Sequence, residues 1–94
     1  MDTYCATFIL RGKAPDGKSI EFEGYSEHVW VGERADRWGK KADYMHFAAD
    51  SLLMPIVQIC QIVSELGGQF EYDCDWLDAY VPMHAVSQIT FEHD

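Results

Sequence analysis

One segment of the chain, residues 52–66, has the spacing of apolar residues that is typical of an amphipathic helix. Asp50 or Ser51 can cap its start, because both side chains accept hydrogen bonds from the backbone donors of a first helical turn. Gly67 and Gly68 follow the segment and predict its end, since glycine adopts the left-handed C-cap conformation at little cost. We therefore predict one main helix over residues 52–66, and the fold must supply an apolar surface for it.

The predicted helix is more apolar than a helix on a single sheet needs to be. Its apolar side chains cover an arc of roughly 220°, whereas an arc of about 100° is enough to rest on one sheet. Either the region around Trp38 folds over the remaining apolar side, or a second copy of the chain covers it. For a homodimer we predict contacts through Leu53, Val57 and Ile62.

Strand patterns precede the helix. Apolar residues alternate with polar ones or cluster over residues 4–10, 19–25 and 28–31, which predicts strands. Residues 32–41 are polar and bracketed by glycines, which predicts a loop or a short helical turn. Whether residues 44–48 form a further strand stays open.

Strand patterns also follow the helix. Residues 69–76 alternate between apolar and mostly acidic side chains, which predicts a half-buried strand. A short strand over residues 79–82, a helical turn over 83–86 and a last strand over 88–92 complete the chain. This order, β-β-(β)-α-β-β-β, predicts a single acidic α+β domain over residues 1–94. We expect an antiparallel sheet of about 4–6 strands with the helix packed on one face.

The net charge of −9 is distributed unevenly along the chain. All seven Lys and Arg residues lie within residues 1–41, where seven acidic residues balance them. Residues 42–94 contain nine acidic residues and no Lys or Arg. This distribution disfavours direct binding to nucleic acid or to an anionic membrane, and it favours a protein partner with a basic surface. Solubility alone is the alternative explanation.

The densest group of acidic residues lies in the strand pattern after the helix. Side chains two residues apart on a strand stand about 6.5–7 Å apart, so Glu71, Asp73 and Asp75 present spaced negative charge on one face. Asp78, Glu65, or Glu21 and Glu23 extend the group if neighbouring strands pair suitably. Nucleic-acid phosphates are also spaced by several ångström, so the group is a candidate partner-binding surface that mimics them. The alternative is the solvated face of an amphipathic strand.

Two tryptophans bear on this candidate surface. Trp38 lies among four basic residues in the polar segment 32–41, and Trp and Arg are favoured anchors at protein interfaces. We therefore include Trp38 among the predicted partner-binding residues. The uninterrupted alternation after the helix places Trp76 on the apolar face, away from the acidic side chains.

Catalytic and metal-binding patterns are missing from the sequence. It contains no nucleophile elbow, no HExxH pair and no phosphate-binding loop, so we predict neither an enzyme nor a cofactor. The spacing Asp73-x-Asp75-x-x-Asp78 lacks the Gly and Glu of a calcium loop, and Cys and His are too scattered for a zinc site. Three cysteines, an odd number, predict reduced core thiols in a cytoplasmic protein. No apolar run has the length of a membrane span.

One short segment resembles a known family. The segment contains Tyr80-Val81-Pro82-Met83, followed by Ala85-Val86 and Ile89. It is similar to the strand–turn–strand segment of the stringent-starvation-type adaptors, which deliver substrates to an AAA+ protease. The resemblance covers residues 80–89 only, and no function is transferred from it.

The sequence leaves three functional hypotheses. The first is a non-catalytic, protein-binding inhibitor encoded by a phage or mobile element. Its acidic surface would block a nucleic-acid-handling host defence complex, as anti-CRISPR or anti-restriction inhibitors do. The second is an immunity protein or antitoxin that neutralises a basic nuclease toxin. The third is a homo-oligomeric housekeeping domain that assembles through the helix.

Overall fold

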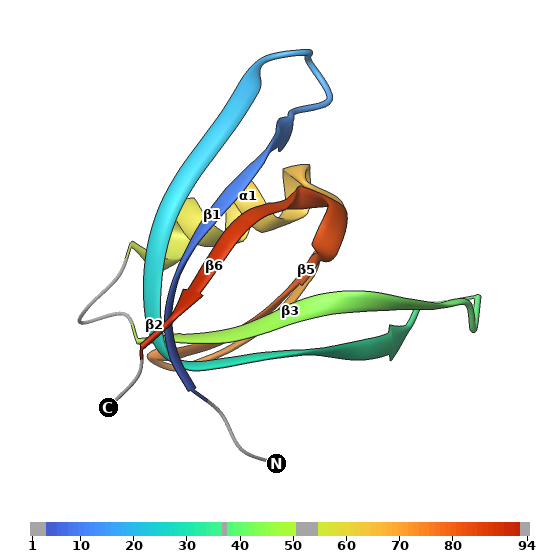
Figure 1. Cartoon of the computed structure of the whole chain (residues 1–94). Helices are drawn as coiled ribbons and strands as arrows, with labels where there is room; N and C mark the ends of the chain where they lie inside the picture. The colour runs from blue at the N-terminus through green and yellow to red at the C-terminus, as the bar shows by residue number, and fades with distance from the viewer. Residues whose placement is uncertain (1–3, 37, 51–54, 93–94) are drawn as a thin grey trace.

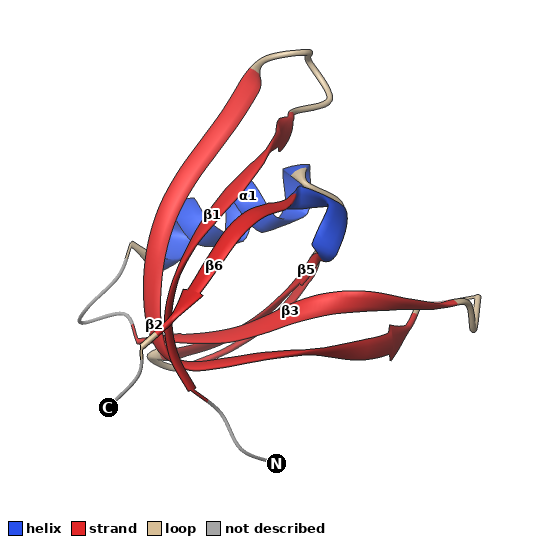
Figure 2. Cartoon of the chain, in the orientation of Figure 1, coloured by secondary structure: helices blue, strands red, loops and turns tan. Residues whose placement is uncertain are grey.

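The computed structural model describes residues 4–36, 38–50 and 55–92, which form one antiparallel sheet of six strands and one α-helix (Figure 1, Figure 2). This confirms the predicted α+β class and the order of strands around a single helix. No helix of the described residues has the length and apolar character needed to cross a bilayer. In chain order the elements are β1 (Tyr4–Lys13), β2 (Ser19–Ala35), β3 (Lys41–Asp50), α1 (Ile56–Glu65), β4 (Gln69–Asp73), β5 (Trp76–Pro82), the 3-10 turn η1 (Met83–Ala85) and β6 (Val86–Phe91).

The strands lie side by side in the order β4-β5-β3-β2-β1-β6, and every neighbouring pair is antiparallel. The seventeen-residue strand β2 changes partner along its length. Its residues 19–26 pair with β1, its residues 29–35 pair with β3, and Val29 also pairs with Tyr4 of β1. As a result, the β1–β2 hairpin and the β2–β3 hairpin project in different directions (Figure 1).

Ser26 lies where β2 changes its pairing partner, and its hydrogen bonds stabilise the backbone there. Its buried hydroxyl donates a hydrogen bond to the Ala48 carbonyl at 2.6 Å and accepts one from the His28 N–H at 3.0 Å. The register between β1 and β2 shifts at the same place, between Tyr4 and Ala6. Such a bulge bends a strand and increases its twist, so β2 can pair with both β1 and β3 although the two hairpins run in different directions.

The core lies between α1 and one face of the sheet. Along β1 the buried residues alternate with exposed or half-buried ones, as expected for a strand with one covered face. The rings of Phe8 and Phe47 lie 4.6 Å apart at its centre, and full burial of a side chain of this size contributes about 1.5–3 kcal/mol. The connected core cluster consists of the buried residues Ala6, Phe8, Leu10, Val29, Met45, Phe47, Ala49, Ile56, Ile59, Val63, Leu66, Leu77, Ala79, Val81 and Ala85.

The start of the helix differs from the prediction. Among the described residues α1 begins at Ile56, with Pro55 in the N-cap position and no side-chain cap. Asp50 does not cap the helix, because it is the last residue of β3. The other predicted cap, Ser51, and residues 52–54 lie outside the described residues.

The prediction of a loop or helical turn over residues 32–41 is wrong, because this segment is the end of the β2–β3 hairpin. Asp36 Oδ1 accepts hydrogen bonds from the backbone N–H groups of Trp38 and Lys40, each at 2.9 Å. An aspartate that bonds the backbone in this way forms a compact turn. The two strands can therefore pair as far as the turn itself.

Several other predicted segments are extended or joined in the structure. The strands predicted over residues 19–25 and 28–31 are two parts of β2, and residues 44–48 lie within β3. The helical turn predicted over residues 83–86 is η1. The segment 80–89, which resembles part of the adaptor family, comprises the end of β5, η1 and most of β6.

The strand predicted over residues 69–76 is divided by a turn. β4 ends at Asp73, Cys74 and Asp75 form a two-residue connection, and β5 begins at Trp76. Cys74 has a φ of 54°, in the left-handed region that favours glycine. Trp76 consequently pairs with Asp73 and shares its face of the sheet, so the predicted separation of Trp76 from the acidic side chains is wrong.

The end of the helix is as predicted. Gly67 has a φ of 82° and donates its N–H to the Ser64 carbonyl at 3.1 Å, while Gly68 donates to the Val63 carbonyl at 2.8 Å. These two bonds form the Schellman motif that ends many helices. Gly68 also lies close to β5, where a Cβ atom on it would overlap the Tyr80 carbonyl oxygen. The helix end and the sheet thus approach each other in a way that only glycine permits.

We predict that Gly68→Ala destabilises the protein by about 1–3 kcal/mol, because the added methyl group forces α1 away from β5. The free energy of unfolding measured by urea denaturation tests this. Ser64→Ala is the control, since Ser64 is exposed on the same helix and its replacement should change stability by no more than about 0.5 kcal/mol. Equal stability of the Gly68→Ala variant and the native chain would contradict the close approach.

Candidate partner-binding surface

Three of the predicted partner-binding residues lie together on the outer face of the sheet, which is the face opposite the helix. Glu71 on β4 pairs with Asp78 on β5, and Asp73 lies two residues from Glu71 on the same face. Leu77 and Ala79 flank Asp78 along β5 and are buried in the core, so Asp78 points the other way. Paired residues have Cβ atoms about 4.5–5.5 Å apart, and residues two apart on a strand stand about 6.5–7 Å apart.

Two further predicted residues have different positions. Asp75 lies in the turn between β4 and β5, next to the outer-face carboxylates. Glu65 is on α1, which covers the inner face, and its Oε1 lies 3.4 Å from the Gln61 amide nitrogen that donates to it. We use the name acidic surface for Glu71, Asp73, Asp75 and Asp78; Glu65 is not part of it.

Trp38 lies far from the acidic surface. It is at the tip of the β2–β3 hairpin, just before Lys41 begins β3, and its side chain is 81% exposed. At the other end of β3, Asp50 pairs with Trp76 beside the acidic surface. A strand of ten residues spans about 30 Å, so Trp38 and the acidic surface form separate regions.

Two residues that the sequence analysis did not select border the acidic surface. Trp76 lies between Asp73 on β4 and Asp50 on β3, and its side chain is 42% exposed. Its ring centroid is 5.8 Å from that of His28. An exposed indole among carboxylates is a favourable contact for a cationic side chain. The turn before Trp76 was hard to recognise because Cys74, which adopts its positive φ, is neither glycine nor asparagine, although Asp75 beside it is a common turn residue.

A histidine borders the same surface. His46 Nε2 lies 3.0 Å from Asp78 Oδ1, which makes an ion pair when the imidazole is protonated. The His46 ring also stacks on Tyr80, with centroids 4.6 Å apart, and the Arg34 guanidinium lies 3.8 Å from the centre of that ring. These contacts fix the position of His46.

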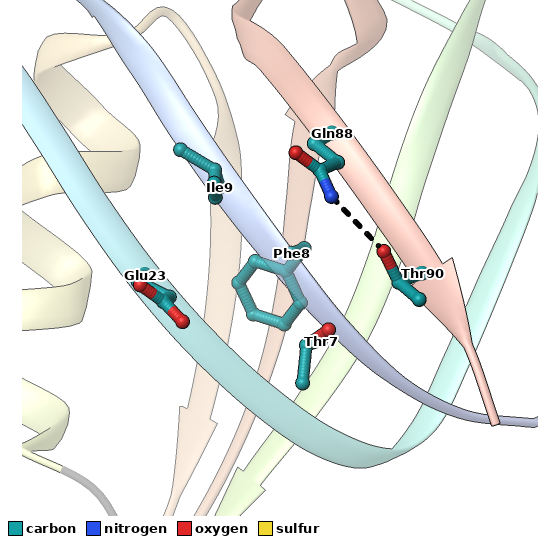
Figure 3. A pocket seen from close by; sticks show the side chains of 6 residues that line it. All are labelled: Thr7, Phe8, Ile9, Glu23, Gln88 and Thr90. Carbon is teal, nitrogen blue, oxygen red and sulfur yellow. Dashed lines mark hydrogen bonds between the residues drawn. The ribbon is translucent and has the colours of Figure 1, made fainter.

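A small hollow on the outer face of β1, β2 and β6 is too small for a ligand. Its volume is about 60 Å³, whereas ligand pockets usually measure about 300–1,000 Å³. Figure 3 shows that it is lined by both polar side chains and the apolar side chains of Phe8 and Ile9, and Gln88 Nε2 donates a hydrogen bond to Thr90 Oγ1 at 3.2 Å. The hollow can hold ordered water at most. Among the described residues, no group of three or more His, Cys, Asp or Glu side chains is placed to hold a metal ion.

The three cysteines occupy different environments. Cys60 is half-buried on α1, and burial raises the pKa of its thiol, which lowers its reactivity. Cys74 is exposed, so the prediction that all three are core thiols is wrong for this residue. Cys5 is half-buried and forms a hydrogen bond with Tyr25. This bond, together with burial and the nearby charges of Glu92 and Glu27, raises the pKa of Tyr25 to about 12.

The helix residues predicted to form an oligomer interface do not share one environment. Val57 is 84% exposed, whereas Ile62 is half-buried and packs against the core. Leu53 lies outside the described residues. Assembly through the helix therefore stays a prediction, and Val57 is the described side chain that most clearly offers it an apolar contact.

Comparison of the chain with family models, with curated proteins and with solved structures found no match. The function proposed below therefore depends on the charges, register and exposure of the residues of this chain.

We predict that Cys5→Ala lowers the pKa of Tyr25 from about 12 toward its ordinary value of 10, because the neutral phenol loses its hydrogen bond. Since the folded-state pKa is the higher one, this bond stabilises the fold below about pH 10, and its contribution is lost as the pH rises toward 12. Tyrosine-labelled NMR across the alkaline range measures the pKa. Cys74→Ala is the control and should leave it unchanged, and an unchanged pKa in Cys5→Ala would contradict the assignment.

Proposed function

We propose that this chain is a non-catalytic protein-binding inhibitor that uses its acidic surface to occupy a basic, nucleic-acid-handling surface of its partner. The partner class we propose is a host defence complex, which the chain would block on behalf of a phage or mobile element. The single observation that supports this is the pairing of Glu71 with Asp78, beside Asp73, in a part of the chain without Lys or Arg.

The repulsion between the facing carboxylates lowers the stability of the fold, and a residue pair retained at such a cost supports a binding role. Like charges directly opposite each other destabilise a sheet, and ordinary protein surfaces intersperse both signs. Here Glu71 faces Asp78, and no Lys or Arg occurs after residue 41 in the sequence. A partner with Lys and Arg side chains would offset the repulsion on binding. It would also associate faster because of long-range attraction.

The position of β4 makes the acidic surface accessible. β4 is an edge strand, and all five of its residues are exposed. Its other face carries Phe70 and Tyr72, which are 40% and 53% exposed. A partner that reaches around this edge can contact apolar rings on one side and carboxylates on the other. Aromatic side chains are enriched at the energetically important positions of interfaces.

Assembly into a homo-oligomer is the second candidate function, and the exposure of Val57 favours it. The two proposals differ in the surface they use, because Val57 is on α1 and the acidic surface is on the opposite side of the sheet. A Val57→Glu substitution would disrupt assembly through the helix and leave the acidic surface unchanged.

We predict that Glu71→Lys/Asp73→Lys weakens capture of the partner from a nuclease-treated bacterial lysate at least about tenfold, because it places cations against a basic surface. Capture by the native chain should also fall as salt concentration rises. The double substitution should keep or raise the melting temperature, since Asp78 would then face a cation in place of a like charge. If the melting temperature is unchanged or higher, weaker capture of the partner is not caused by unfolding of the variant.

The matched control is Glu21→Lys/Glu33→Lys, which changes the net charge by the same amount on β2. These two glutamates form exposed ion pairs with Arg11 and Lys41, whose loss should have a small effect on stability. Capture by the control should stay close to that of the native chain. If both double variants capture the partner as well as the native chain does, the acidic surface is not the binding surface.

A further inference from the structure

A groove opens where β2 and β3 separate. The pairing of these strands ends at Val29 and Phe47, so the last residues of β3 pair with β5 but not with β2. The groove has a volume of about 640 Å³ and lies between the segment 22–28 of β2, the end of β3, Pro55 and Trp76. This volume is within the usual range for sites that hold a ligand or a side chain of a partner.

Small and aromatic residues make the groove walls largely apolar. A Cβ atom on Gly24 would come within 2.8 Å of the Phe8 ring and 2.9 Å of the Phe22 ring, so these rings pack directly over the glycine backbone. Phe22 lines the groove on the β2 side, and Trp76 lines it across from β2. Ala48, which also lines the groove, has a small side chain. The groove can therefore accept an aliphatic chain.

Carboxylates are the charged side chains that the described lining of the groove contributes, together with the imidazole of His28. Glu23, Glu27 and Asp50 line it, and its described lining contains no Lys or Arg. The raised pKa of Tyr25, another lining residue, agrees with a negative local potential, since Glu27 contributes to it in addition to the hydrogen bond with Cys5. An apolar groove with carboxylates at its border favours a ligand that combines an alkyl chain with a positive charge.

We propose that this groove binds an arginine side chain presented by a peptide segment of the partner. The alkyl part would lie along Phe22 and Trp76, and the guanidinium would meet the carboxylates of Glu27 and Asp50. Arginine fits better than lysine, because its planar guanidinium stacks on an indole and bonds carboxylates through two donors. Trp76 also pairs with Asp73, so one partner segment can contact the groove and the acidic surface together.

This inference rests on the proposed function for the basic character of the partner, but it concerns a separate group of residues. The probe is a capped peptide, acetyl-Gly-Arg-Leu-Arg-Gly-amide, titrated into the native chain and followed by amide and indole NMR shifts. We expect shifts at Gly24, Ser26 and the Trp76 indole. The peptide with citrulline in place of arginine should bind at least about tenfold more weakly, because it keeps the shape but loses the charge.

Two charge-removing variants test the assignment of the carboxylates. Glu27→Gln and Asp50→Asn should each weaken binding of the arginine peptide by about three- to tenfold, whereas Glu21→Gln, which lies outside the groove, should not. Equal binding of the citrulline peptide, or no shift at the groove residues, overturns the proposal.

The outcomes for the groove and for the proposed function are distinguishable. Shifts confined to β4 and the turn at Asp75 would mean that the acidic surface binds cations and that the groove does not. Shifts in the groove, combined with partner capture that is insensitive to Glu71→Lys/Asp73→Lys, would support the groove and contradict the proposed function.

Discussion

The bend in β2 at Ser26 is the constraint on which the rest of the structure depends. A strand of seventeen residues that kept one partner would form a single long, twisted two-stranded ribbon. The bond from the Ser26 hydroxyl to the Ala48 carbonyl, at 2.6 Å, instead joins β2 to β3 where their pairing ends. Because the hydroxyl is buried and its bonds are satisfied, it can hold this geometry without the penalty of an unpaired polar group. The divergent hairpins and the groove both follow from it.

The second constraint is the size of the helix. A helix of ten residues is about 15 Å long, whereas six strands at about 4.8 Å spacing make a sheet about 24 Å wide. Even a curved sheet of this width is not covered by one short helix. α1 approaches β4 and β5 most closely, yet Phe70 and Tyr72 on β4 stay exposed, although they lie on the helix side of the sheet. The edge position of β4 leaves Glu71 and Asp73 open to a partner.

The sequence predicted those elements whose structure depends on residues close to one another in the chain. The alternation over residues 4–10 and the glycine pair at Gly67 and Gly68 predicted β1 and the end of α1, because each depends on near neighbours. The turn at Cys74 could not be predicted, since a cysteine with a φ of 54° gives no turn signal. That turn decides which face Trp76 occupies.

The candidate site was partly predictable for the same reason. Glu71 and Asp73 share a face by strand alternation alone, and the sequence predicted this. The position of Asp78 opposite Glu71 depends on the turn at Cys74, whereas that of Asp50 beside Trp76 depends on the register between strands far apart in the chain. No local pattern encodes that register, nor the separation of β2 from β3 that opens the groove.

The central claim is that the acidic surface and nucleic acid occupy the same surface of the partner. The most direct measurement is the binding of a labelled duplex by the purified partner while the concentration of this chain is raised at fixed, moderate salt. The account predicts mutual exclusion, with the duplex released in proportion to the amount of complex formed. A stable ternary complex, in which the partner holds the duplex and this chain together, would contradict it.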